Sequence, residues 1–285
     1  MAHRRCGKLL DATIAAELPR LDALLRHGLA NGATELRRIS AEQAREMEPA
    51  LACVAAMHSP SSGIVDSHGL MTSLLGDAER AGALLVLLSP FESARRDGKR
   101  WLLHTGGAEP FEMSCRWLIN AVGPGAQAVA GRMQDFPVAA IPAQHLAKGH
   151  YFALTGRSPF SRLIYPMPVD GGLGMHLTLD LSGQARFGPD VQWLPAGTAE
   201  ATLDYRVDES RRDGFETDIR RYWAALPAGA LQPAYTGVRP KFSGPADHGC
   251  EGVVQLLGIE SPGLRASPAV AALEAELVIG QQVCP

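Results

Sequence analysis

A glycine turn within residues 116–131 has residue types and spacing that could hold a nucleotide. An apolar run leads into it, and Gly123, Gly125 and Ala128 have the G-x-G-x-x-A spacing of a turn that binds a dinucleotide pyrophosphate. Pro124 removes one backbone N–H from the part of the loop that would donate to phosphate. Three interpretations stay open here: a turn that binds a pyrophosphate, a structural turn, and a cofactor contact of another kind.

A second glycine turn, at residues 257–264, leads from an apolar run directly into a predicted helix. Ser261 suits the N-cap of that helix and Pro262 suits its first position. Free backbone N–H groups and the positive end of the helix dipole meet at such a point, and they attract anions or the electron-rich edge of a ring. The alternative is a well-capped surface helix.

Apolar patterns predict the elements that position these turns. The continuous apolar run at 83–91 predicts a strand buried on both faces, and the apolar stripe at 69–82 predicts a helix that forms an α/β unit with it. Strand, glycine turn and strand are predicted over 99–123, and strand, turn and helix over 253–278.

The stretch from about residue 140 onward has a different pattern. Short strands alternate with Gly and Pro, and Leu177, Leu179 and Leu181 alternate with polar residues, which predicts a mostly antiparallel sheet. Because the α/β pattern flanks this sheet on both sides, the predicted fold class is mixed α/β and α+β. An α/β domain is expected to be interleaved with the antiparallel sheet.

Composition excludes several classes of protein. The 285 residues carry a net charge of −3, with 20% charged and 46% hydrophobic residues, which is ordinary for a globular protein and gives no pull toward nucleic acid. No apolar run is long enough to span a bilayer, and the N-terminus lacks the apolar core of a signal peptide. The five scattered cysteines support neither a metal site nor a disulfide framework, so a cytoplasmic protein is expected.

At the two glycine turns the sequence resembles the D-amino-acid-oxidase-like FAD-dependent oxidoreductases. LINAVGPGA is similar to their strand-plus-turn motif, and GIESPGLRAS is similar to their C-terminal flavin-contacting turn. The L-2-hydroxyglutarate dehydrogenase-like branch is the most similar, because SPSSGIVDSHGLM, LIYPMPVDGGLGMHLTLDLSG, FGPD and YTGVRPKFSG also match in order. These matches extend over most of residues 45–270.

The resemblance implies FAD as the cofactor and assigns residues to it. The backbone around Ala121 and Gly123 would pass near the ribose and pyrophosphate, and Phe91 would lie near the adenine. The helix after the second turn would stabilise negative charge on the flavin ring. The residues that would wrap the isoalloxazine are Gly258, Ile259, Glu260, Ser261, Pro262, Gly263 and Leu264.

The resemblance also implies a small carboxylate substrate. Arg239 would hold the carboxylate by two hydrogen bonds, and His176 would act as the base for a substrate hydroxyl. Tyr165, His68 and Lys148 are further candidates for substrate binding. A structural histidine among strands and a surface arginine before proline are the alternatives for the first two.

The implied domains are discontinuous. Residues 1–65 and 140–245 would form the substrate domain, and residues 66–139 and 246–285 the remainder of the FAD domain. The family's N-terminal βαβ unit, which carries G-x-G-x-x-G, does not occur in these residues, so apolar strand edges are expected to be exposed.

The expected function is oxidation of a small 2-hydroxy acid, similar to L-2-hydroxyglutarate, by hydride transfer to FAD and then to an unidentified electron acceptor. The activity is expected to be impaired in this chain, or restored by a separate chain that supplies the βαβ unit. The alternatives are a non-catalytic fragment and a carboxylate-binding module without flavin.

Overall fold

The computed structural model describes residues 1–137, 139, 141–168, 174–243 and 251–280. Contacts divide the chain into two units, each made of three segments. Unit 1 consists of Met1–Ala83, Gly149–Val191 and Tyr205–Gly237. Unit 2 consists of Leu84–Lys148, Gln192–Asp204 and Val238–Pro285. The assignment of a substrate role to one part and a flavin role to the other stays a prediction.

Unit 1 is built on one sheet with the strand order β10-β13-β12-β11-β2-β4-β3. Its strands are β2 (Lys8–Ala12), β3 (Arg37–Ser40), β4 (Ala55–Ser59), β10 (Ala143–Leu154), β11 (Leu163–Pro166), β12 (Leu177–Leu179) and β13 (Ala185–Phe187). The β11–β2 pair is parallel, whereas β10–β13, β11–β12, β12–β13, β2–β4 and β3–β4 are antiparallel. The mostly antiparallel sheet expected from the sequence is therefore confirmed.

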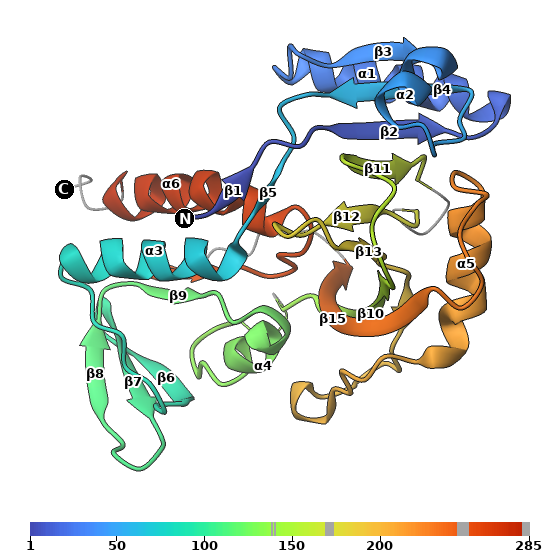
Figure 1. Ribbon diagram of the computed structural model, residues 1–285. Coiled ribbons are helices and arrows are strands. Elements are labelled where there is room, and N and C mark those ends of the chain that lie inside the picture. Colours follow the sequence, from blue (N-terminus) through green and yellow to red (C-terminus); the bar gives the residue numbers. More distant parts are fainter. Residues whose placement is uncertain (138, 140, 169–173, 244–250, 281–285) are drawn as a thin grey trace. The chain divides into compact units, whose positions relative to one another are not determined.

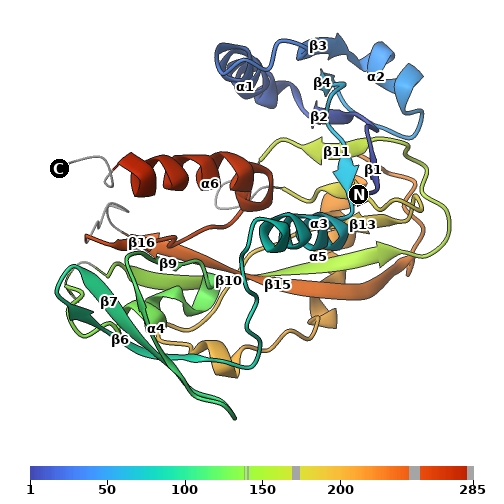
Figure 2. The same cartoon turned by 90° about the vertical axis from the view of Figure 1, so that its left-hand side faces the viewer.

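Two long strands run on from unit 1 into unit 2. The last strand of the sheet, β15 (Leu231–Ser243), pairs with β10 (Figure 2). Within unit 2, Ala147 and Lys148 of β10 pair with the short strand β14 (Gln192–Trp193).

The helices of unit 1 begin where side-chain caps satisfy their first N–H groups. Ser40 and Gln43 form a reciprocal capping box at the start of α2, and Asp66 accepts from Gly69 N at 3.0 Å at the start of α3. These helices are α1 (Leu18–Ala30), α2 (Ala41–Met47), α3 (Ser67–Arg80) and α5 (Arg212–Arg220). Two short strands, β1 (His3–Arg4) and β5 (Ile64–Val65), pair with each other.

Core side chains of unit 1 pack on both faces of the sheet. On one face, Phe152 and Phe187 pack with Phe215 of α5 (Figure 1). On the other face, Met57 of β4 packs with Leu21 of α1. Because side chains alternate along a strand, residues next to the α5-side core residues extend from the opposite face.

Unit 2 contains two small sheets. The first is antiparallel, with the order β6-β7-β8 (Figure 1), and the second is a parallel pair, β9 and β16 (Figure 2). Trp101, Leu118, Met133, Phe136 and Val253 form the core of this unit. The elements are β6 (Phe91–Asp97), β7 (Arg100–Thr105), β8 (Glu112–Cys115), β9 (Leu118–Asn120), α4 (Ala126–Ala130), β16 (Val253–Gln255) and α6 (Gly263–Gly280).

The strand expected at residues 83–91 is wrong. This segment has no strand before Phe91, and Leu84 and Leu88 are 90% and 89% exposed. The helix expected before it is confirmed as α3, but the two do not form an α/β unit, and Met71 and Leu74 of α3 are also exposed. A strand that is apolar on both faces needs neighbours on both edges. Within the described part of the chain, no strand pairs with this segment.

Within the described residues, no helix is long and apolar enough to cross a membrane. The same residues contain no group of three or more His, Cys, Asp or Glu placed to hold a metal ion.

Candidate functional site

The two glycine turns chosen from the sequence leave the same edge of one parallel strand pair in unit 2. β9 and β16 run in the same direction, with Asn120 opposite Gln255 at their carboxyl ends. Gly123 follows Asn120 by three residues, and Gly258 follows Gln255 by three residues. The carboxyl ends of parallel strands are where open α/β sheets bind ligands. The tertiary structure thus brings together two stretches that are far apart in the sequence.

Asn120 holds this edge together. Its buried side-chain amide donates to Gln255 Oε1 at 2.6 Å and to Ala126 O, at the start of α4, at 2.8 Å. Its Oδ1 is also buried, and it has no hydrogen-bond partner among the described residues. Buried polar atoms are nearly always paired, so an unpaired acceptor at a ligand-binding edge indicates a missing donor.

The two glycines at the turns adopt backbone conformations that favour glycine. Gly123 has φ +61°, and a Cβ built there would meet nothing within 4 Å, so the turn faces open space. Gly258 has φ +67°, and a Cβ there would lie 2.9 Å from Cδ2 of Phe242 on β15. The first turn therefore leaves room for a ligand beside the backbone, and the second packs tightly against its own unit.

The helix after the second turn begins at Gly263, one residue after Pro262, its predicted first position. Pro268 lies inside this helix. The preceding turn is held to β15 by an ion pair, because Lys241 Nζ lies 2.6 Å from Glu260 Oε1. The turn from Gly258 to Leu264 is therefore fastened at its centre, and Ile259 and Leu264 are exposed beside it.

Phe91 is the first residue of β6 and is half-buried against the core of unit 2. The guanidinium carbon of Arg132 lies 5.8 Å from the centre of its ring, and Arg132 Nη1 donates to Phe91 O at 2.8 Å. Its predicted place near the adenine is not tested by these contacts.

In unit 1, Tyr165 and His176 lie together. Their rings are stacked, with centres 3.7 Å apart and planes 9° apart. Lys8 Nζ lies 5.1 Å from the centre of the Tyr165 ring. Tyr165 follows the core residue Ile164 on β11, and its half-buried side chain also packs against the core. Two candidate residues that are eleven positions apart in the sequence thus form one aromatic pair.

A cavity of about 870 Å³ in unit 1 lies over the sheet face from which Thr178 and Arg186 extend. His68, at the start of α3, lines this cavity together with Thr178 of β12, Arg186 of β13 and Tyr235 of β15. Burial raises the pKa of the Tyr235 phenol, and the nearby Arg186 guanidinium offsets part of the rise. Sequence reasoning selected His68 and missed the other three. The alternation of apolar and polar residues along β12 and β13 could have identified Thr178 and Arg186 from the sequence.

Lys148 and Arg239 lie in unit 2. Lys148 is buried in β10, opposite Gln192 of β14, and Arg239 is half-buried in β15. Near the same ends of β10 and β15, His145 Nε2 lies 3.1 Å from Ser243 Oγ. Two cations on paired strands suit an acidic ligand. Their predicted roles are not tested by these contacts.

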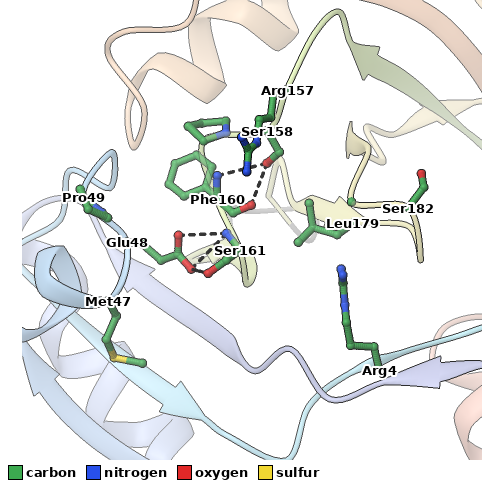
Figure 3. A pocket seen from close by; sticks show the side chains of 12 residues that line it. Arg4, Met47, Glu48, Pro49, Arg157, Ser158, Phe160, Ser161, Leu179 and Ser182 are labelled. Carbon is green, nitrogen blue, oxygen red and sulfur yellow. Dashed lines mark hydrogen bonds between the residues drawn. The ribbon is translucent and has the colours of Figure 1, made fainter.

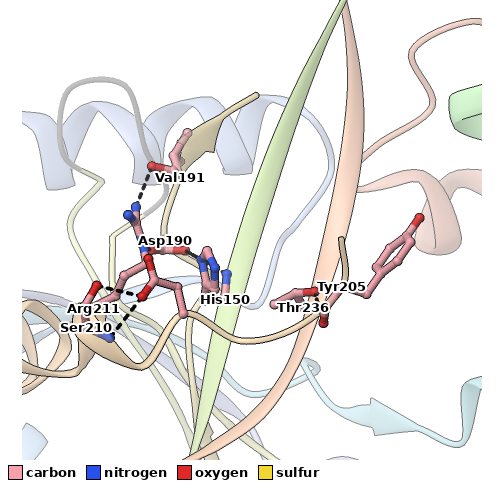
Figure 4. Close-up of polar contacts among 8 residues, drawn as sticks. His150, Asp190, Val191, Tyr205, Ser210, Arg211 and Thr236 are labelled. Carbon is pink, nitrogen blue, oxygen red and sulfur yellow. Dashed lines mark hydrogen bonds and ion pairs between the residues drawn. The ribbon is translucent and has the colours of Figure 1, made fainter. Parts of the chain in front are cut away.

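A buried polar cluster joins His150, Asp190 and Arg211 in unit 1 (Figure 4). The backbone N and the Nδ1 of His150 lie 2.7 and 3.0 Å from Asp190 Oδ1, and Arg211 pairs with Asp190 Oδ2. The His150 side chain is fully buried, so this cluster fastens β10 to the segment before α5. Sequence reasoning did not select it.

A second cleft of about 450 Å³ in unit 1 is lined by Arg4, Arg157 and a buried carboxylate, Glu48 (Figure 3). Glu48 accepts hydrogen bonds from Ser161 N and Ser161 Oγ and pairs with Arg162 at 3.0 Å. Its charge is thereby satisfied within the protein.

One protein-family model matches most of this chain. The model of the family described as FAD dependent oxidoreductase (DAO) matches residues 1–277. The chain belongs to this family. FAD is the family's cofactor, as the resemblance of the two turns implied.

Relatives in this family are L-2-hydroxyglutarate dehydrogenases. The mitochondrial enzyme of Arabidopsis thaliana is 37% identical over 315 residues, which cover 94% of this chain and 65% of the relative. The enzyme of Indibacter alkaliphilus is 28% identical, covering 76% of this chain and 55% of the relative. The chain thus spans less than two thirds of the length of these relatives.

Solved structures of similar fold include two FAD-family oxidases. L-α-glycerophosphate oxidase from Mycoplasma pneumoniae has a TM-score of 0.84 at 20% identity, covering 96% of this chain and 73% of that one. Glycine oxidase from Bacillus cereus has a TM-score of 0.77 at 17% identity, covering 98% and 74%. These likenesses confirm the mixed α/β fold class.

The carboxyl edge of β9 and β16 fits a flavin nucleotide. The open space beside Gly123 allows a close backbone approach, the unpaired Asn120 Oδ1 offers an acceptor, and the N-terminus of α6 offers the positive end of a helix dipole. An FAD molecule has both polar edges and hydroxyl donors, which suit such a set.

Proposed function

We propose that the chain takes part in the FAD-dependent oxidation of a small 2-hydroxy acid, of the L-2-hydroxyglutarate type, to the 2-oxo acid. The observation that carries this proposal is the juxtaposition of the two glycine turns at the carboxyl ends of β9 and β16. The Arabidopsis relative, at 37% identity, supports the substrate class.

Unit 2 would hold the cofactor. Ala121 and Gly123 would approach the ribose and pyrophosphate, and the turn from Gly258 to Leu264 would border the flavin ring. When bound, FAD supplies an acceptor for the hydride that leaves C2 of the substrate. The positive end of the α6 dipole would stabilise negative charge at the ring edge.

Two residues would act on the substrate. Arg239 would hold the carboxylate next to C2 with two parallel hydrogen bonds. His176 would take the hydroxyl proton, so that the C–O bond becomes a carbonyl as the hydride leaves. The stacked Tyr165 ring supports this role of His176, because it fixes the plane of the imidazole.

The first test is a visible absorption spectrum of the purified 285-residue chain with added FAD, after gel filtration. We expect flavin bands that stay with the protein and that bleach on anaerobic addition of L-2-hydroxyglutarate. Retained flavin without bleaching by any 2-hydroxy acid would contradict the reaction. A colourless protein would favour the second candidate, a carboxylate-binding module, which the cavity inside unit 1 supports.

We further propose that another protein segment covers Leu84–Leu88 in the active form. Five consecutive apolar residues, each more than half exposed, support this proposal. The segment would come from a separate chain or from further residues of a longer one. The reaction would also require an electron acceptor that reoxidises the flavin, and we propose a cytoplasmic location.

A further inference from the structure

The cavity over the unit 1 sheet has a chemical preference of its own. We propose that it binds the second carboxylate of a dicarboxylic 2-hydroxy acid, and that Arg186 is the residue that selects such substrates. This inference rests on the proposed function, because it names the class of substrate that the proposed reaction would take.

The register of the sheet places the key side chains together. Thr178 and Arg186 lie directly opposite each other on the antiparallel strands β12 and β13, so both extend from the same face. His176 extends from that face too, because it precedes Thr178 by two residues. Two residues along an extended chain span about 7 Å, which matches the length of a short dicarboxylic acid.

Arg186 is held in place but still accessible. One of its terminal nitrogens lies 3.1 Å from Asp180 Oδ2, and its side chain remains 36% exposed. A guanidinium carries five N–H groups, so an ion pair through one nitrogen leaves others for a ligand. Asp180 therefore orients Arg186 without using all its donors.

The carboxylates that line the cavity accept hydrogen bonds from the protein. Asp180 Oδ1 accepts from Ser182 N, Ser182 Oγ and Gln184 N at 2.6–3.0 Å. Asp66 caps α3 through Gly69 N at 3.0 Å. The groups left to meet a ligand are then mostly donors: those of Arg186, the Tyr235 hydroxyl and the His68 ring. Such a set selects a ligand rich in acceptors, as a carboxylate is.

The position of Tyr235 also shapes the cavity. Its ring stacks on Tyr151, with centres 4.5 Å apart and planes 17° apart. This stacking fixes the wall of the cavity on the side of β15 and β10. The methylene chain of a dicarboxylic acid would lie against this aromatic wall while its terminal carboxylate reaches Arg186.

The test needs no flavin. Glutarate, which carries two carboxylates and no hydroxyl to oxidise, is titrated into the 285-residue chain by calorimetry, and butyrate serves as the one-carboxylate comparison. We expect glutarate to bind about tenfold more tightly, because one charge-assisted hydrogen-bonded pair distinguishes the two ligands. Arg186→Gln should abolish that difference. The control Arg157→Gln, an exposed arginine that lines the other cleft, should keep it.

If Arg186→Gln does not fold, Arg186→Lys tests the role of Arg186 instead. Lysine keeps the charge beside Asp180 but loses the planar fork, so the preference for glutarate should fall by about threefold or more. Equal binding of glutarate and butyrate by the unaltered chain, no binding of glutarate, or an unchanged preference in the folded Arg186 variants would each overturn the inference. A failure of flavin bleaching, by contrast, concerns only the proposed reaction.

Discussion

Asn120 and Gln255 lie side by side as the last residues of two parallel strands, and the Asn120 amide donates to Gln255 Oε1 at 2.6 Å. This bond links two segments that are 135 residues apart in the sequence. Each residue leads within three positions to a glycine turn, so the pair sets the spacing between the two turns. The first prediction tests this relationship.

Asn120→Leu should destabilise the protein by about 1–3 kcal/mol, because Ala126 O and Gln255 Oε1 lose a buried donor. Urea denaturation followed by tryptophan fluorescence measures the change. Asn31→Leu is the control, since Asn31 is exposed at the end of α1 and should change stability little. Equal effects of the two substitutions would contradict the structural role of Asn120.

Gly258→Ala should weaken FAD binding and lower stability by about 1–3 kcal/mol. The alanine would be strained at φ +67°, and its Cβ would lie 2.9 Å from Phe242. Gly156→Ala is a matched control, because φ is +89° there and a Cβ would meet nothing within 4 Å. Both variants share the backbone strain, and only Gly258→Ala adds the contact with Phe242. A flavin titration and a thermal melt of both variants therefore separate the two effects.

Asp11 should make stability fall as the pH rises. It is fully buried, and burial raises its pKa from 3.8 to about 8. The folded protein therefore keeps this proton from pH 3.8 to about pH 8, whereas the unfolded chain releases it near 3.8. The stabilisation is complete below pH 3.8 and is lost as the pH rises through 8, a change on the order of 5 kcal/mol.

Asp11→Asn should remove most of that dependence, because the amide resembles the neutral carboxyl and does not titrate. The free energy of unfolding, measured in urea at pH 5 and at pH 8, gives the slope directly. Asp22→Asn is the control, since Asp22 forms an exposed ion pair with Arg38. The same slope in Asp11→Asn as in the unaltered protein would show that another group is responsible.

Glu48→Ala should cost about 3–5 kcal/mol, because it leaves Ser161 N (Figure 3) and Arg162 without their partner. Glu46→Ala, at an exposed position of the neighbouring α2, should cost under about 1 kcal/mol. Chemical denaturation of both variants tests the difference. A cost for Glu48→Ala as small as that for Glu46→Ala would contradict the buried network.

Arg239→Lys should raise KM for the 2-hydroxy acid by about tenfold or more in a flavin-loaded, active form, because lysine cannot make two parallel hydrogen bonds to a carboxylate. Steady-state kinetics with a dye acceptor measure KM and kcat separately. Arg265→Lys, at an exposed position of α6, is the control. Unchanged kinetics in Arg239→Lys would count against its carboxylate role.

The sequence by itself determined the local elements and the family. The capping box at Ser40 and Gln43, α3, the antiparallel strands from residue 140 and the strand that leads into Gly123 all follow from local patterns of capping and alternation. These patterns depend on neighbours within a few residues, so the sequence carries them completely. The motifs around the two turns carried the family in the same way.

Only the tertiary structure decided which of these residues meet. The pairing of Asn120 with Gln255, the stacking of Tyr165 on His176 and the meeting of His68 with Arg186 depend on register between distant strands. The apolar run at Leu84–Leu88 failed as a strand for the same reason. A strand forms only when another strand supplies its hydrogen bonds, and no local pattern states whether that neighbour is present.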